Sequence, residues 1–262
     1  MEYQNLRFEL AEGVATITLN RPDAANAIDL ALARELMQVA IRCDDDPSVR
    51  AVLLTAAGKM FCAGGDLKSF AAQGDRLPSH LKEVTTNLHA ATSRFARMNA
   101  PLVVAVNGTA AGAGFSIAIA GDLVLIAESA KLTMAYTAAG LSPDGSSTWY
   151  LPRLVGMRRA QELMLTNRRL SAAEALEWGL VNQVVPDADL AATAGALARQ
   201  LAAGATRAFG TVKSLLASTF SESLETQMEH EARGIAAMAG GADGREGIDA
   251  FVAKRAPKFS GR

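Results

Sequence analysis

Two glycine-rich stretches stand out in this sequence, Met60-Phe-Cys-Ala-Gly-Gly-Asp66 and Asn107-Gly-Thr-Ala-Ala-Gly-Ala-Gly114. In each, the main chain can approach a ligand closely, because glycine carries no Cβ. Two backbone N–H groups that converge on one oxygen form an oxyanion hole, which stabilises negative charge on a carbonyl. A third segment, Leu141-Ser-Pro-Asp-Gly-Ser-Ser147, places Asp144 in a turn where a carboxylate can work as a base. Together these segments predict chemistry on a carbonyl compound.

Length and composition indicate one large α/β domain, or one domain with a helical appendage. The chain has 262 residues, of which 50% are hydrophobic and 20% charged, so it can form a substantial core and is not globally disordered. The net charge of −1 argues against a nucleic-acid partner, because non-specific binding to nucleic acid needs a clustered basic excess.

The sequence gives no sign of a disulfide framework, a metal site or a membrane anchor. Its two cysteines are too few for a framework, and its three histidines lack the spacing of a zinc site. The polar N-terminus does not resemble a secretory signal, and no apolar run reaches the roughly 18 residues that a membrane span needs. We therefore expect a soluble, cytoplasmic protein without a metal or a membrane partner.

Hydrophobic periodicity predicts strands that alternate with helices. Alternation at residues 6–10 and 14–19 predicts a β-hairpin, and Asp29 is expected to N-cap a helix that runs to Cys43. Further strands are expected at 51–55, 102–106, 123–127, 131–134 and 181–185, and further helices at 81–98, 112–120, 148–154, 158–165 and 172–178. This alternation predicts a mainly parallel sheet with helical crossovers.

The chain beyond Pro186 reads as helical, with stretches at 189–203, 206–219, 222–239 and 246–254. Because these helices are rich in apolar residues, we expect their exposed face to pack on a neighbouring subunit.

Several short motifs follow one another in an order and spacing that resemble the crotonase (enoyl-CoA hydratase/isomerase) superfamily over nearly the whole chain. They are Asn20-Arg-Pro with Asn26-Ala, Phe61-Cys-Ala-Gly-Gly-Asp-Leu67, Pro101 through Asn107-Gly, Ala111-Gly-Ala-Gly114, Gly121-Asp122, Gly140-Leu-Ser-Pro-Asp-Gly145, Leu154-Val-Gly-Met-Arg-Arg-Ala160, Ala172-Ala-Glu-Ala175, Trp178-Gly-Leu-Val181, Phe251 and Lys254-Arg255.

The resemblance implies an α/β fold, a crotonase-like spiral of ββα turns with a C-terminal helical trimerisation region. Residues 1–195 are then the acyl-CoA-binding spiral core domain, and residues 196–262 are the trimerisation region. The expected assembly is a homotrimer or a dimer of trimers, with an acyl-CoA thioester as substrate. No cofactor is expected beyond the coenzyme A of that thioester.

The resemblance also implies roles for individual residues. The thioester carbonyl would lie between the N–H groups of Gly65 and Ala113, with Asp144 as the single acid/base. Substrate or CoA contacts are expected from Ala63, Gly64, Asp66, Lys68, Gly112 and Tyr136, and from Phe251 and Lys254 reaching the CoA of a neighbouring subunit.

Two family glutamates are missing from this chain. Hydratases of the family use a pair of glutamates, because water must be deprotonated while a proton is delivered to carbon. Those positions fall on Ser116 and Tyr136, which disfavours ordinary hydration. Asp144 lies where several family isomerases carry a single carboxylate, and the motif around it is similar to that of 1,2-epoxyphenylacetyl-CoA isomerases. One carboxylate suffices for a 1,3-proton shift, although on local sequence Asp144 could also N-cap the following helix.

The sequence also allows other functions. Family members that dehalogenate 4-chlorobenzoyl-CoA place a nucleophilic Asp at Asp144 and a water-activating His at His89, but hold that Asp with a Trp where this chain has Tyr136. Weak hydration, or acyl-CoA binding without turnover, are further possibilities. The acyl group would be selected by residues 69–88 together with Phe70, Phe95, Phe115, Met134, Tyr136 and Trp149.

Overall fold

The computed structural model describes residues 3–262, and its chain begins with the predicted hairpin. Strands β1 (Leu6–Ala11) and β2 (Val14–Leu19) pair antiparallel, with Leu6 opposite Leu19. The turn between them contains Gly13 at a φ of 77°, in the left-handed region that glycine adopts readily. The inward side chains of β2 alternate into the core, as the sequence pattern predicted.

A six-stranded sheet forms the larger layer of the molecule. It adds β3 (Ala51–Ala56), β5 (Leu102–Val106), β7 (Leu123–Ala127) and β10 (Gln183–Val185) to the hairpin, in the order β1-β2-β3-β5-β7-β10. Every neighbouring pair except β1 and β2 is parallel. All residues of β5 are buried, which is expected of a central strand covered on both faces.

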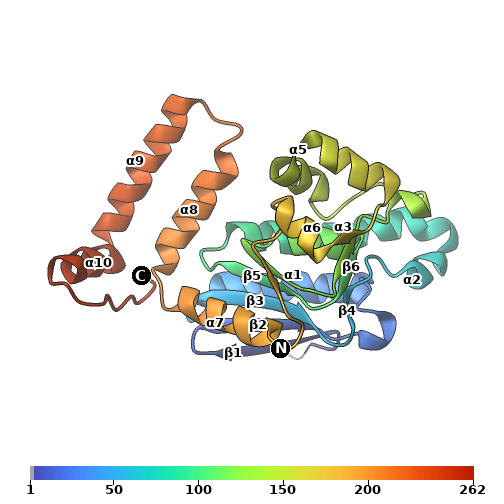
Figure 1. The fold of residues 1–262 in the computed structure, drawn as a ribbon, viewed down its shortest axis with the longest axis horizontal. Coiled ribbons are helices and arrows are strands. Elements are labelled where there is room, and N and C mark those ends of the chain that lie inside the picture. Colours follow the sequence, from blue (N-terminus) through green and yellow to red (C-terminus); the bar gives the residue numbers. More distant parts are fainter. Residues whose placement is uncertain (1–2) are drawn as a thin grey trace.

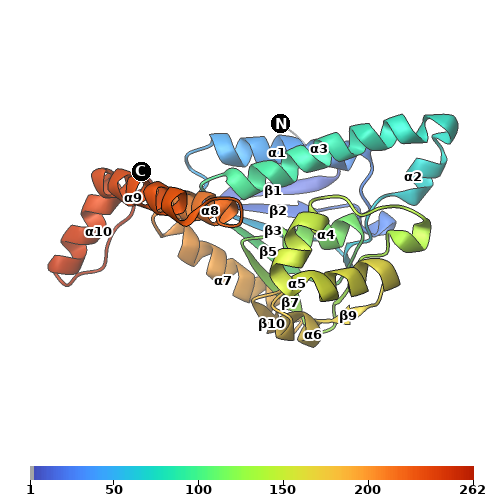
Figure 2. The same ribbon diagram turned by 90° about the horizontal axis from the view of Figure 1, so that it is seen from above.

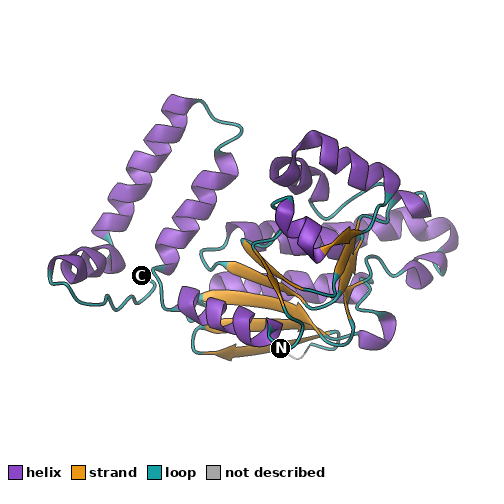
Figure 3. Ribbon diagram, viewed as in Figure 1, coloured by secondary structure: helices purple, strands orange, loops and turns teal. Residues whose placement is uncertain are grey.

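A second sheet of four short strands lies across one end of the first (Figure 3). Its order is β4 (Met60–Cys62), β6 (Thr109–Ala111), β8 (Lys131–Thr133) and β9 (Leu170–Ser171). Strands β3, β5 and β7 of the large sheet each continue into β4, β6 and β8 of the small one, and a helix then follows. This repeated step confirms the expected spiral of ββα turns.

Except for α2, for which the sequence predicts no bounds, the helices that complete these turns begin and end near their predicted bounds. They are α1 (Leu30–Asp45), α2 (Leu67–Ala71), α3 (Leu77–Arg97), α4 (Ala113–Ile119), α5 (Ser147–Thr166) and α6 (Ala172–Glu177), with short 3₁₀ turns at Pro22–Ala24, Gly74–Arg76 and Thr137–Ala139. The Asp29 carboxylate accepts the Leu32 N–H at 2.8 Å, which confirms the predicted N-cap of α1. Helix α5 is broken at Gly156 (φ 77°, ψ 161°), so two helical stretches follow one another there, as predicted.

Some bounds differ from the prediction for identifiable reasons. Helix α3 begins at Leu77 rather than at residue 81, with Pro78 in its first turn, where a missing N–H costs nothing. Strands β4, β6 and β9 have only two or three residues and therefore show no period in the sequence.

The C-terminal helices leave the sheet and extend to one side (Figures 1 and 2). Helix α7 (Leu190–Ala202) still packs on β3 and β5, whereas α8 (Thr206–Ser218), α9 (Leu224–Gly240) and α10 (Ala242–Val252) extend beyond them. The proposed division of the chain between residues 195 and 196 lies inside α7, and it stays a prediction.

Helices α8–α10 and the turn between α8 and α9 carry many exposed apolar side chains. These are Val212, Leu216, Phe220, Leu224, Met228, Ile235, Ile248, Phe251 and Val252. Within residues 3–262, no helix is both long and apolar enough to cross a membrane.

A half-buried lysine, Lys213, fastens α8 to the core. Lys213 Nζ donates to the main-chain oxygens of Phe95 (2.8 Å) and Ala100 (3.1 Å), and pairs with Asp122 Oδ2 at 2.7 Å. Asp122 Oδ2 also accepts the Leu102 N–H at 2.7 Å, at the start of β5. Burial lowers the pKa of Lys213, and the Asp122 charge opposes that shift. One ammonium group therefore joins α8, the end of α3 and the central strand.

We predict that Lys213→Met lowers the free energy of unfolding by about 3 kcal/mol, because it leaves the Asp122 carboxylate without its opposite charge and two main-chain carbonyls without their donor. Urea denaturation at one fixed protein concentration measures the change. Arg233→Met is the matched control, since Arg233 pairs with Glu229 on the surface (79% and 58% exposed), and its loss should cost less than about 0.5 kcal/mol. Equal effects of the two substitutions would contradict the anchoring role of Lys213.

Candidate active site

The first glycine turn connects β4 to α2 and presents a free backbone donor. Gly64 adopts a φ of 97°, and its N–H faces the Cys62 sulfur at 3.4 Å. Gly65 donates its N–H to no acceptor among the described residues, although Asp66 and Ala63 on either side are hydrogen-bonded. The turn thus holds its main chain in place and leaves the Gly65 N–H available.

The second glycine turn connects β6 to α4 in the same way. Gly112 has φ 52° and ψ −126°, a conformation that residues with a side chain rarely adopt, and it donates its N–H to Thr133 O at 3.1 Å. Ala113 is the first residue of α4, so its N–H has no partner within the helix. The positive end of the helix dipole adds to the attraction that this N–H exerts on a negative oxygen.

These two turns are in direct contact. A Cβ built on Gly64 would lie 2.9 Å from Ala111 O and 3.4 Å from Ala113 N, and one on Gly114 would lie 2.4 Å from Cys62 O. Gly65 and Ala113 both line the same pocket. Two unpaired N–H groups on facing turns around one pocket are the arrangement that an oxyanion hole requires.

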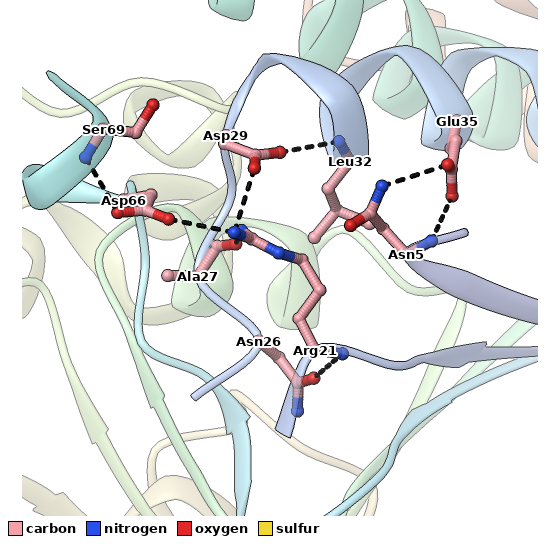
Figure 4. Close-up of polar contacts among 9 residues, drawn as sticks. All are labelled: Asn5, Arg21, Asn26, Ala27, Asp29, Leu32, Glu35, Asp66 and Ser69. Carbon is pink, nitrogen blue, oxygen red and sulfur yellow. Dashed lines mark hydrogen bonds and ion pairs between the residues drawn. The ribbon is translucent and has the colours of Figure 1, made fainter. Parts of the chain in front are cut away.

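Arg21 braces the first turn from the side (Figure 4). Its guanidinium pairs with Asp29 Oδ2 at 2.9 Å and with Asp66 Oδ2 at 3.1 Å, and it also donates to Ala27 O. The other Asp66 oxygen accepts the Ser69 N–H at 3.0 Å and so caps α2. Arg21 therefore joins the starts of α1 and α2 on either side of the turn.

Main-chain hydrogen bonds fix the same turn to residues 25–28. Ala63 N donates to Ala25 O at 3.0 Å, Ile28 N to Gly64 O at 2.7 Å, and Asp66 N to Ile28 O at 2.9 Å. Asn26 is fully buried, and its amide donates to Met60 O at 2.9 Å. Sequence reasoning noted Asn20-Arg-Pro and Asn26-Ala only as family motifs and missed this bracing role.

The pocket between the turns is an apolar cavity of about 320 Å³. Among the described residues that line this cavity, Lys82 and Asp144 are the charged ones. The rest of the lining is Ile28, Ala63, Gly64, Gly65, Leu67, Phe70, Pro78, Leu81, Val84, Thr85, Leu88, Gly112, Ala113, Ala135, Tyr136, Ala139, Leu141 and Ser142. The walls suit an uncharged hydrocarbon group.

The predicted pocket-shaping residues divide into two groups. Phe70 and Tyr136 line the pocket, and the Phe70 ring packs on Gly65, where a Cβ would lie 2.5 Å from ring atom Cε2. Phe95, Phe115 and Met134 are buried in the core instead, and Trp149 is 40% exposed outside the pocket. The expectation that these last four shape the pocket is wrong, because composition alone does not say which apolar side chains face a cavity.

Asp144 lies at the pocket wall, half-buried, between the 3₁₀ turn at Thr137–Ala139 and α5. The Tyr136 hydroxyl donates to Asp144 Oδ1 at 2.5 Å, and the Ser116 hydroxyl lies 3.0 Å from the Tyr136 oxygen. Burial and the neighbouring Asp144 charge raise the pKa of Tyr136, so its phenol stays a donor. The alternative that the Asp144 side chain caps α5 is wrong: Ser146 occupies the N-cap position, and no side chain caps that helix.

His89 supports the Asp144 loop from α3. Its Nε2 accepts the Gly145 N–H at 3.1 Å, and its side chain is largely exposed rather than part of the pocket lining. The lone pair that a general base would use is therefore engaged by the main chain. Ser147 adds a further hydrogen bond, from its hydroxyl to Asp144 O at 3.0 Å.

The other predicted binding residues lie outside the pocket of this chain. The Asp66 carboxylate is paired with Arg21, and Lys68 is exposed on α2. Phe251 is 85% exposed on α10, and Lys254 follows that helix, at the far end of the molecule from α2 (Figure 1). Their contacts with CoA stay predictions.

No group of three or more His, Cys, Asp or Glu within residues 3–262 is arranged to hold a metal ion.

Comparisons with known proteins find relatives that match nearly the whole chain. The family model for enoyl-CoA hydratase/isomerase matches residues 9–262. The chain is 42% identical to 1,2-epoxyphenylacetyl-CoA isomerase of Escherichia coli, over 96% of each chain. It is 39% identical to 4-chlorobenzoyl coenzyme A dehalogenase-2 of an Arthrobacter species, over 90% of this chain and 86% of that protein. The crystal structure of an enoyl-CoA hydratase from Bacillus anthracis superposes with a TM-score of 0.92 at 33% identity, over 99% of this chain and 100% of that one.

We predict that both cysteines are inert in the folded protein. Burial raises the pKa of Cys62, at the first turn, and of Cys43, on α1, to about 12, so at pH 8 almost no thiolate forms and reagents have no access. An aromatic disulfide reagent should release no thiolate from the native protein and two equivalents from protein in urea. One equivalent released rapidly from native protein would mean that a buried thiol becomes exposed.

Proposed function

The chain belongs to the enoyl-CoA hydratase/isomerase family, and we propose that it isomerises 3-enoyl-CoA thioesters to 2-enoyl-CoA thioesters by a 1,3-proton shift. The observation that carries this proposal is the single carboxylate, Asp144, in the described lining of a pocket that also holds the Gly65 and Ala113 donors.

In the proposed mechanism the Asp144 carboxylate takes a proton from C2 of the acyl group. The electron pair of the broken C–H bond forms a dienolate, whose negative charge rests on the thioester oxygen between the Gly65 and Ala113 N–H groups. Asp144 then returns the proton to C4, the double bond moves from C3–C4 to C2–C3, and the carbonyl is restored. Each oxyanion donor is worth about a hundredfold or more in rate.

Ser116 and Tyr136, at the positions of the two hydratase glutamates, disfavour hydration. Ser116 is fully buried, and its hydroxyl lies within hydrogen-bond distance of Tyr136, which in turn donates to Asp144. Neither residue has a carboxylate to deprotonate water while a second group protonates carbon. Their hydrogen bonds support Asp144 instead.

Dehalogenation of an aryl thioester is the second candidate, favoured by the 39% identity to the Arthrobacter enzyme. In that reaction Asp144 would attack the ring carbon and displace chloride, and His89 would activate water to hydrolyse the aryl ester. The Gly145 N–H already occupies His89 Nε2, which counts against this role. Non-catalytic binding remains as an outcome of the experiment below.

We further propose that the exposed apolar side chains of α8–α10 pack on neighbouring subunits in a homotrimer or a dimer of trimers. In the isolated chain Phe220, Leu224 and Ile235 are each about 70% exposed, and exposed apolar side chains that gather on one part of a protein mark an interaction surface.

Asp144→Asn should lower kcat for a 3-enoyl-CoA by at least a thousandfold, because the amide cannot accept the C2 proton. Affinity for a saturated acyl-CoA of the same chain length should change less than about threefold, since the pocket wall is preserved. The matched 2-enoyl-CoA, assayed beside it, should be hydrated only weakly by the wild type.

Other outcomes separate the alternatives. Robust hydration of the 2-enoyl-CoA would contradict the isomerase proposal, and chloride release from 4-chlorobenzoyl-CoA would favour the dehalogenase. Binding without turnover of any of the three thioesters would indicate a non-catalytic binder. A wild-type rate retained in Asp144→Asn would show that Asp144 is not the base.

A further inference from the structure

We propose that Tyr136 and Ser116 are positioning residues that hold Asp144 Oδ1, so that Oδ2 alone takes and returns the proton. This inference rests on the proposed role of Asp144 as the base. Tyr136 and Ser116 occupy the positions at which family hydratases carry their two glutamates. The proposal gives these two residues the function of placing the Asp144 carboxylate relative to the oxyanion hole.

The direction of the hydrogen bonds follows from the number of protons. An ionised carboxylate only accepts, so the single hydroxyl proton of Tyr136 is donated to Asp144 Oδ1, at 2.5 Å. The Tyr136 oxygen is then left as an acceptor. The Ser116 hydroxyl has one proton and two acceptors within reach, the Tyr136 oxygen at 3.0 Å and Gly112 O at 3.3 Å, and donates to the nearer one. The chain of donors therefore runs from Ser116 through Tyr136 to Asp144.

The main chain around Tyr136 keeps its ring in place. Tyr136 N donates to Met134 O at 2.7 Å, and Tyr136 O accepts the N–H groups of Ala139 (2.9 Å) and Leu141 (3.0 Å). The ring also lies against the second glycine turn, since a Cβ on Gly112 would be 4.0 Å from its Cζ. The phenol is thus fixed beside the oxyanion turn before any substrate arrives.

Ser116 links this chain to the helix that carries an oxyanion donor. Helix α4 is buried along its whole length, and Ser116 lies one turn after Ala113. Ser116 also touches the loop of the base, because a Cβ on Gly145 would lie 2.9 Å from Ser116 Cβ. A single rigid helix therefore determines the position of both the Ala113 N–H and, through Tyr136, the carboxylate.

The phenol can hold Oδ1 throughout the reaction. It donates to the carboxylate before proton transfer and to the carbonyl oxygen of the neutral acid afterwards, while Oδ2 carries the proton between C2 and C4. No hydrogen bond to Oδ2 is found among the described residues, so this oxygen is available. Charge-assisted hydrogen bonds of this kind are stronger than neutral ones and fix orientation.

The test compares Tyr136→Phe with wild type in two assays. One is kcat for a 3-enoyl-CoA, and the other is exchange of the C2 protons of a saturated acyl-CoA in D₂O, followed by NMR. Exchange needs only the base and the oxyanion hole, so it reports on Asp144 even if isomerisation is not the reaction. Both rates should fall about 10- to 100-fold, the usual range for losing a hydrogen bond to a charged group, with KM and acyl-CoA affinity within about twofold of wild type.

Two further variants distinguish positioning from general structural damage. Tyr150→Phe removes the same hydroxyl from a half-buried tyrosine outside the pocket lining, and it should leave both rates unchanged. Ser116→Ala should slow both reactions by less than Tyr136→Phe does. If Ser116 acts on Asp144 through the phenol and not through its other neighbour, Gly112 O, the double variant should be no slower than Tyr136→Phe alone.

In the variants, the positioning proposal would be overturned by unchanged rates in Tyr136→Phe, by a loss of acyl-CoA affinity in step with the rates, or by multiplicative effects in the double variant. Exchange that is fast in the wild type and slow in Tyr136→Phe, without turnover of the 3-enoyl-CoA, would support positioning while contradicting the isomerase proposal. Absence of exchange in the wild type would overturn the positioning proposal as well.

Discussion

The contact between the two glycine turns is the constraint on which the rest of the site depends. Gly64 meets Ala111 O and Ala113 N, and Gly114 meets Cys62 O, at separations that leave no room for a methyl group. The turns can therefore meet only as bare main chain, and each then contributes one unpaired N–H to the pocket. The ββα spiral supplies this contact by placing β4 and β6 side by side in the small sheet.

The base is held by groups that come from several elements. The Tyr136 hydroxyl donates to the Asp144 side chain, and the Ser147 hydroxyl, at the start of α5, donates to the Asp144 carbonyl. His89 on α3 accepts the N–H of Gly145, the residue after Asp144. The Asp144 loop packs directly against α4, because a Cβ at position 145 would lie only 2.9 Å from the Ser116 Cβ.

Local patterns were sufficient for the features that depend on neighbouring residues. The apolar run at 102–106 indicated a buried strand, Asp29 indicated a helix cap, and the glycine turns with Asp144 indicated the pocket where the structure has it. The features that sequence reasoning missed depend on distant pairs, such as Arg21 with Asp66, or Ser116 with Tyr136. Phe95 and Phe115 were predicted to line the pocket, but they are core residues. The residues that flank an apolar residue in the sequence do not show whether it lines a cavity or lies in the packed core.

The central claim is that the two turns and Asp144 act on one thioester. A crystal structure of the Asp144→Asn variant with a bound 3-enoyl-CoA tests it most directly. The account predicts the thioester oxygen about 2.7–3.1 Å from both the Gly65 and Ala113 nitrogens, with the side chain at position 144 facing C2 and C4 and the Tyr136 hydroxyl still bonded to it. A thioester oxygen bound away from either nitrogen, or an acyl chain directed away from position 144, would contradict the account.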